Sequence, residues 1–152
     1  MKLAEALLHR AELQKTLASL KARLASNVRI QEGDVPSENP SDLLVAAQQV
    51  IGHLANLINQ IHQTNAQARL ADGRRLLDLL TQRDELLDRH KLLQVAIDNT
   101  KATEERYSYR EIKWSIVIPV ASLQQQADDL SVKIRDLNVL IQATNWQIDL
   151  VA

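Results

Sequence analysis

Residues 120–148, VASLQQQADDLSVKIRDLNVLIQATNWQI, decide the fold of this chain. Apolar side chains recur in this stretch at alternating spacings of three and four residues, which places them on one face of an α-helix. Because the repeat is sustained, it predicts left-handed coiling and knobs-into-holes packing against other helices. The seam consists of Val120, Leu123, Ala127, Leu130, Ile134, Leu137, Ile141 and Thr144.

Three further segments carry the same rhythm and predict three more long helices, over residues 2–27, from residue 40 to about residue 65, and over residues 75–100. The second of these has a clear start, because Asn39 can cap the helix and Pro40 suits its first position. Asp72-Gly73 is the strongest turn signal of the chain and predicts the break before the third helix.

The second predicted helix has more apolar residues than one seam needs. Beside its main seam, Leu44, Ile51 and Ile58 form a parallel stripe one residue further along. Three apolar positions in each seven residues predict a face wide enough to meet two neighbouring helices.

These features predict an all-α fold, an antiparallel bundle of four long coiled-coil-like helices in one domain over residues 1–152. A small strand pair or an extended loop is expected at one end. Val28 to Ile30 and Ile112 to Ile118 alternate in polarity, so they are the candidate strands.

Composition excludes several classes of protein. The chain has no Cys, which removes disulfides and thiolate chemistry, and its net charge of -1 argues against binding to nucleic acid through bulk positive charge. No apolar run approaches the roughly 18 residues of a membrane span, and the N-terminus lacks the pattern of a secretion signal. We therefore expect a soluble cytoplasmic protein that binds neither membrane nor nucleic acid.

A second apolar stripe lies on the last predicted helix, opposite its main seam. Val132, Val139 and Trp146 recur every seven residues and therefore share one face. A helix that is apolar on two faces must bury both, so the stripe is a candidate homo-oligomer interface. The alternative is that the first helix or the C-terminal tail covers it.

Two polar residues interrupt the apolar seam of the third predicted helix. Arg83 and His90 lie seven residues apart on the inward face. A buried charge is costly unless it is paired, so the two residues predict a buried polar layer that fixes helix register. The alternative is a functional polar pocket within the bundle.

The segment before residue 114 is the candidate recognition loop. Aromatic and basic side chains alternate there, in an arrangement that can stack bases, although nearby glutamates nearly cancel the charge. The alternative is that the aromatic residues anchor a long loop to the bundle. The candidate residues are Arg106, Tyr107, Tyr109, Arg110 and Trp114.

Sequence motifs indicate no reaction. No Glu-x-x-His pair, nucleophile elbow or glycine-rich phosphate loop is present, so we expect no catalytic, cofactor or metal residues. Glu85 and Asp88, with His90, have a spacing that a metal-dependent hydrolase could use, and this stays open as an alternative.

Several stretches together resemble an uncharacterised bacterial family labelled septicolysin-like. They are residues 2–8 (KLAEALL), 28–33 (VRIQEG), 61–65 (IHQTN), 72–74 (DGR), 107–113 (YSYREIK) and 143–146 (ATNW). The label implies a cytolysin as an alternative function. The residues themselves favour an oligomeric helical interaction or scaffold protein, which binds copies of itself or an unidentified protein partner.

Overall fold

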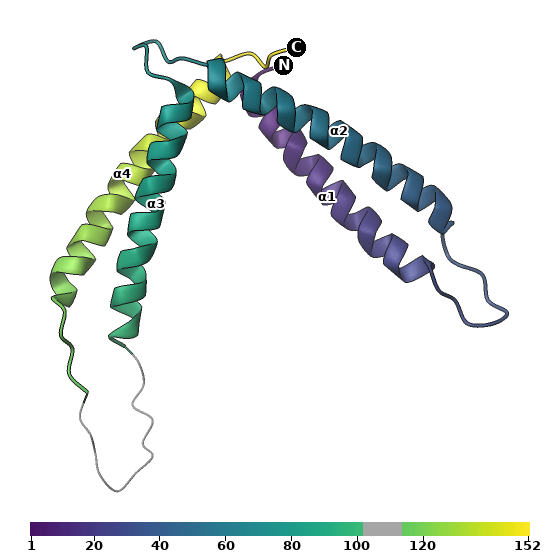
Figure 1. The fold of residues 1–152 in the computed structure, drawn as a ribbon, viewed down its shortest axis with the longest axis horizontal. Coiled ribbons are helices and arrows are strands. Elements are labelled where there is room, and N and C mark those ends of the chain that lie inside the picture. The colour runs from purple at the N-terminus through teal and green to yellow at the C-terminus, as the bar shows by residue number, and fades with distance from the viewer. Residues whose placement is uncertain (102–113) are drawn as a thin grey trace, which may run out of the picture. The chain divides into compact units, whose positions relative to one another are not determined.

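The computed structural model describes residues 1–101 and 114–152. These residues form four long helices, which confirms the predicted fold class, an all-α helical bundle (Figure 1). The helix bounds lie within a few residues of the predicted ones. They are α1 (Leu3–Asn27), α2 (Pro40–Gln67), α3 (Leu76–Asn99) and α4 (Val120–Gln147).

In the described residues, the segments predicted as strands are extended loops, the alternative that the sequence also allowed. Residues 29–31 and 114–117 have no regular structure, and the described residues contain two isolated bridges and no named strand. Residues 112 and 113 lie outside the described part. Two strands paired by themselves, without a third strand or a covering helix, are only marginally stable in water.

Contacts divide the chain into two compact units, one of residues 1–76 with 142–152 and one of residues 77–141. Each unit contains a helical hairpin, and each is described below by itself. The expectation of a single domain stays a prediction.

In the first unit, α1 and α2 lie side by side as an antiparallel hairpin (Figure 1). Leu20 of α1 and two residues of α2, Leu43 and Ala47, are buried together in its distal half. These residues belong to the seams that the heptad spacing predicts. Partly buried Leu17, Leu24, Ala46 and Val50 pack around them.

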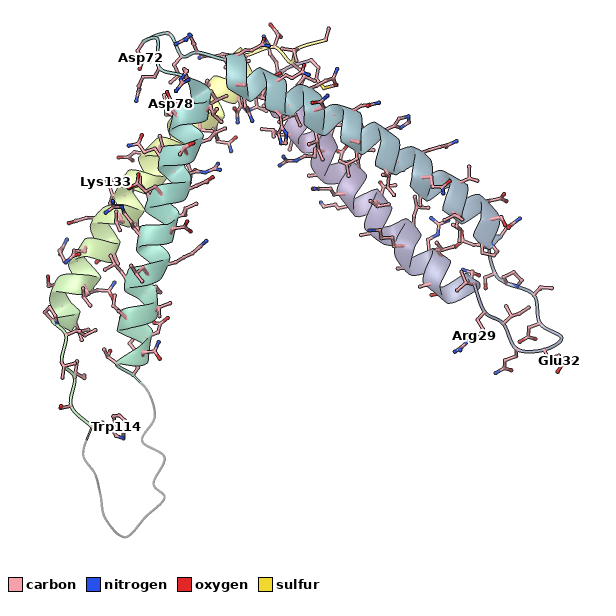
Figure 2. All side chains as sticks on the ribbon, in the orientation of Figure 1. Arg29, Glu32, Asp72, Asp78, Trp114 and Lys133 are labelled. Atoms are coloured by element: carbon pink, nitrogen blue, oxygen red, sulfur yellow. The ribbon has the colours of Figure 1, made fainter. Side chains whose placement is uncertain are left out.

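Side chains from both ends of the α1–α2 loop hold it in place. Asn27, buried at the end of α1, accepts a hydrogen bond from the Glu38 N–H through Oδ1 at 3.0 Å. Arg23 Nε donates to the Glu38 carboxylate at 2.8 Å. Asn39 then caps α2 by accepting from the Ser41 N–H at 2.9 Å, as the sequence predicts. Figure 2 shows Arg29 and Glu32 in this loop.

The two chain ends pair with each other in the first unit. The Leu3 N–H donates to the Ile148 carbonyl, and the Leu150 N–H donates to the Met1 carbonyl, both at 2.9 Å. The buried Thr64 hydroxyl of α2 accepts from the Val151 N–H at 3.0 Å. The C-terminal tail is thereby fixed to both α1 and α2.

The turn between α2 and α3 is built around Gly73, with φ at +87°. Its N–H donates to the Leu70 carbonyl at 2.9 Å, and Asp72 Oδ1 accepts from the Arg74 N–H at 3.0 Å. Only glycine adopts this left-handed conformation without cost, which is why the Asp-Gly signal predicted the turn (Figure 2).

In the second unit, α3 and α4 form the other hairpin (Figure 1). The residues buried there are Leu79 and Ile97 of α3 and Ala127 and Ile141 of α4, the last two from the seam that the sequence predicts. Between them the leucines of the seam are half-buried. Among the described residues, no helix is both long and apolar enough to cross a membrane.

Candidate functional site

The outer face of α4 carries the stripe that the sequence singled out. Val132, Val139 and Trp146 are 47%, 64% and 53% exposed. Since seven residues make almost two full turns, the three side chains follow one another along one face. The stripe is therefore exposed in a single chain and is available for contact with a second copy, and the oligomer interface stays a prediction.

Polar residues flank this stripe on α4. The Arg135 guanidinium bonds the Asp136 carboxylate at 3.1 Å, and Gln125 donates to Asp129 at 3.0 Å. These are bonds between neighbours on one helix. A polar border around apolar residues is the arrangement found at many protein interfaces.

Arg83 and His90, the predicted polar layer, are both half-buried and have different partners. The Arg83 guanidinium bonds Asp84 on the same helix at 3.0 Å. His90 Nε2 lies 3.1 Å from the Ser131 hydroxyl, which also donates to the Ala127 carbonyl. His90 thus links α3 to α4, whereas Arg83 bonds within α3.

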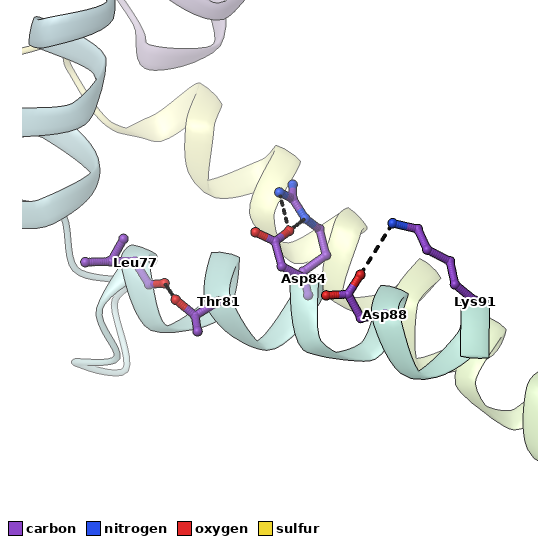
Figure 3. Close-up of polar contacts among 6 residues, drawn as sticks. Leu77, Thr81, Asp84, Asp88 and Lys91 are labelled. Atoms are coloured by element: carbon purple, nitrogen blue, oxygen red, sulfur yellow. Dashed lines mark hydrogen bonds and ion pairs between the residues drawn. The ribbon is translucent and has the colours of Figure 1, made fainter. Parts of the chain in front are cut away.

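Acidic residues of α3 face solvent in ion pairs with cations of the same helix. Glu85 bonds Arg89 at 2.7 Å. Asp88 lies 3.4 Å from Lys91, a pair that Figure 3 shows. Among the described residues, no three His, Asp or Glu side chains converge as a metal site would require. The hydrolase alternative, which needed Glu85, Asp88 and His90 in one cavity, loses its basis.

The candidate recognition loop falls mostly outside the described residues. Arg106, Tyr107, Tyr109 and Arg110 all belong to the part of the chain that the structure does not describe. Trp114, at the near edge of the described part, is 84% exposed (Figure 2).

A shallow groove of about 340 Å³ lies between α3 and α4. Both charge signs and several leucines line it, and Figure 2 labels Lys133 on its α4 side. Its lining offers no nucleophile next to a base. The lining residues are Arg89, Leu92, Leu93, Gln126, Asp129, Leu130 and Lys133.

Three carboxyl groups have a pKa below its usual value, and each of them lies in an ion pair. Hydrogen bonds from Arg23, Arg74 and Lys2 lower the pKa values of their partner carboxyl groups. All three pairs are exposed and fix loops or chain ends, so they are structural. The carboxyl groups concerned are Glu38, Asp72 and Asp149.

Sequence reasoning missed one surface. It assigned the Leu44, Ile51 and Ile58 stripe to a neighbouring helix, yet Leu44 and Ile51 are 47% and 48% exposed. The near absence of charge along α2 is the signal that could have identified this surface.

Comparisons with known proteins give a family without an assigned activity. The model of a family of unknown function, DUF6847, matches residues 10–150. A crystal structure of a functionally unknown conserved protein from Corynebacterium diphtheriae is similar, with 34% sequence identity, a TM-score of 0.86 and coverage of 99% of each chain. No curated protein matches the chain.

These matches correct the resemblance drawn from the sequence. The septicolysin-like assignment is wrong, because both the family and the related crystal structure are of unknown function and neither has a link to septicolysin. The stretches that suggested it are three to seven residues long, too short to identify a family. The cytolysin alternative rested on that label alone and therefore has no support.

Proposed function

The chain belongs to the DUF6847 family, and we propose that it is an oligomeric helical interaction protein that binds protein chains and catalyses no reaction. The observation that carries this proposal is the exposed α4 stripe of Val132, Val139 and Trp146. Large apolar side chains repeated along one face of a helix are a recurrent mark of protein interfaces.

The most direct partner is another copy of the same chain. Because the three positions of the stripe are evenly spaced, the stripes of two copies can pack antiparallel around a two-fold axis at Val139. Val132 then lies against Trp146 of the second copy. Trp is among the residues that contribute most to binding at interfaces. We further propose that the protein is cytoplasmic, and its net charge of -1 favours a protein partner over nucleic acid.

Light scattering coupled to size-exclusion chromatography tests this proposal. The wild-type protein is expected to elute as an oligomer, and Val139→Glu is expected to raise the dissociation constant at least ~100-fold, because a carboxylate would be buried without a partner. Circular dichroism checks that the variant keeps its helices.

Gln124→Glu is the matched control. Gln124 is exposed on α4 about 22 Å along the helix from Val139 and beyond the end of the stripe, so a carboxylate there stays in water. The control is expected to keep the wild-type mass. A wild-type protein that is monomeric at every concentration tested would refute the proposal.

A further inference from the structure

The outer face of α2 is almost free of charge. Asp42, in the first turn, is the only charged residue between Pro40 and Gln67. By contrast, α1 carries Lys, Arg and Glu along most of its length. Helix faces that stay in water ordinarily carry charged residues, whereas the buried centre of a protein interface is depleted of them.

Apolar side chains occupy this uncharged face. Leu44 and Ile51 are about half exposed, Ile58 is half-buried, and the three are seven residues apart. The packing of α2 on α1 uses a different set of residues, which includes Leu43 and Ala47. The outer stripe is therefore left available on the α1–α2 hairpin.

Short side chains of α1 extend this face. Alanines recur every seven residues on α1, and Ala11, Ala18 and Ala25 are exposed. In an antiparallel pair, heptad positions on the same flank of the two seams lie on the same side. The alanines of α1 and the Leu44 stripe of α2 share that flank, so the face is two helices wide. Exposed Lys15 and Lys21 lie beside the alanines, so the charge-free part of the face is its α2 half.

We propose that this face of the α1–α2 hairpin binds the same face of a second copy and completes a four-helix bundle. The inference rests on the proposed self-association but concerns a different surface from the α4 stripe. On the α2 half of this face a charged partner would lose its hydration without finding a counter-charge, whereas an uncharged helix face is complementary to itself.

The register follows from the spacing of the stripe. A two-fold axis at Ile51 sets Ile51 against Ile51 of the second copy and Leu44 against Ile58. Residues 43–67 span about 37 Å, and two helices are roughly 20 Å wide. Such a face offers on the order of 700 Å² per copy, near the ~800 Å² per partner of stable complexes.

Light scattering tests the face with Ile51→Glu. The variant is expected to have a lower mass than the wild-type protein, with the dissociation constant of this interface raised at least ~100-fold by a buried, unpaired carboxylate. Gln49→Glu is the matched control, because Gln49 is exposed roughly 160° around α2 from Ile51 and is expected to leave the mass unchanged.

Comparison with Val139→Glu separates the two proposals. If both faces act, each single variant leaves a dimer of 17.1 kDa chains, and the wild-type protein has a larger mass than either variant. If Ile51→Glu keeps the wild-type mass, the α2 inference is overturned whatever Val139→Glu does. If only Val139→Glu keeps it, the α4 stripe fails and the α2 inference stands. A monomeric wild-type protein overturns both.

The absence of Cys from the chain allows a test of the register. In a variant with one cysteine, any disulfide must join two copies. Mild oxidation is expected to give a covalent dimer with Ile51→Cys and little with Gln49→Cys. Equal cross-linking of the two variants would overturn the two-fold arrangement at Ile51.

Discussion

Helices α2 and α3 are both long, with 28 and 24 residues, but their outer faces differ in charge. The outer face of α2 carries Leu44, Ile51, Gln and Asn, with Asp42 alone charged. The outer face of α3 carries ion pairs between residues three or four apart, Glu85 with Arg89 and Asp88 with Lys91, of which the second is drawn in Figure 3.

The difference indicates two ways in which a long helix is made stable. Ion pairs between residues three or four apart support a helix that stays in water, each by a few tenths of a kcal/mol. A helix without such pairs gains its stability from packing, and α2 packs on α1 through the face of Leu43 and Ala47, not through that of Leu44 and Ile51. The contrast therefore favours the outer face of α2 as a binding surface.

Adjacent leucines of α2 give the largest expected effect. Leu43→Ala removes a side chain that is 5% exposed and is expected to cost about 2–5 kcal/mol of unfolding free energy at any protein concentration. Leu44→Ala, at a position 47% exposed, is expected to cost less than about 1.5 kcal/mol in a single chain.

Urea denaturation at two protein concentrations measures both variants. If α2 binds a second copy, the cost of Leu44→Ala rises with concentration while that of Leu43→Ala does not. A cost for Leu44→Ala that is independent of concentration would show that the outer face of α2 does not bind a second copy, contrary to what the comparison with α3 suggests.

Polar links within the two hairpins give an intermediate effect. Asn27→Ala leaves the Glu38 N–H without its acceptor in a partly buried site, so about 1–3 kcal/mol of unfolding free energy should be lost. Ser131→Ala removes the contact with His90 from a more exposed position and should cost less than about 1 kcal/mol. Thermal unfolding of both variants measures the difference, and the reverse order would contradict it.

Acid titration of Glu38 gives the smallest effect. The hydrogen bond from Arg23 lowers the pKa of Glu38 below its ordinary value of 4.5. Because the pKa is lower in the folded chain, the contribution of this pair to stability is present above pH 4.5 and is lost as the pH falls through the folded value.

Carboxyl chemical shifts in an NMR titration measure this pKa. Arg23→Gln is expected to return the Glu38 midpoint towards its ordinary value, whereas Arg89→Gln, which breaks an exposed pair on α3, should leave it unchanged. A Glu38 midpoint that Arg23→Gln does not move would show that the loop contact is absent in solution.

Much of the fold follows from local sequence. Heptad spacing predicted each helix to within a few residues, Asn39 and Pro40 marked the start of α2, and Asp72-Gly73 marked the turn. These signals are readable because each depends on residues a few positions apart along the chain. The α4 stripe was found in the same way, from three residues at one spacing.

Candidate site residues were harder to predict. Val132 and Val139 are exposed, as an interface stripe requires, but Arg83 and His90 share a seam and have separate partners. Periodicity gives the face of a helix on which a residue lies. It does not give the partner that the side chain meets, because the partner comes from another helix at a depth set by packing.

The sequence by itself determined that this protein is four long helices, where each begins, and which faces are apolar. Tertiary structure alone decided that the chain ends pair through Leu3 and Leu150, that Thr64 holds Val151, and that Leu44 and Ile51 stay exposed. The physical reason is distance along the chain. Helix formation follows from neighbours within two turns, whereas these contacts join residues far apart in sequence and depend on how whole helices pack.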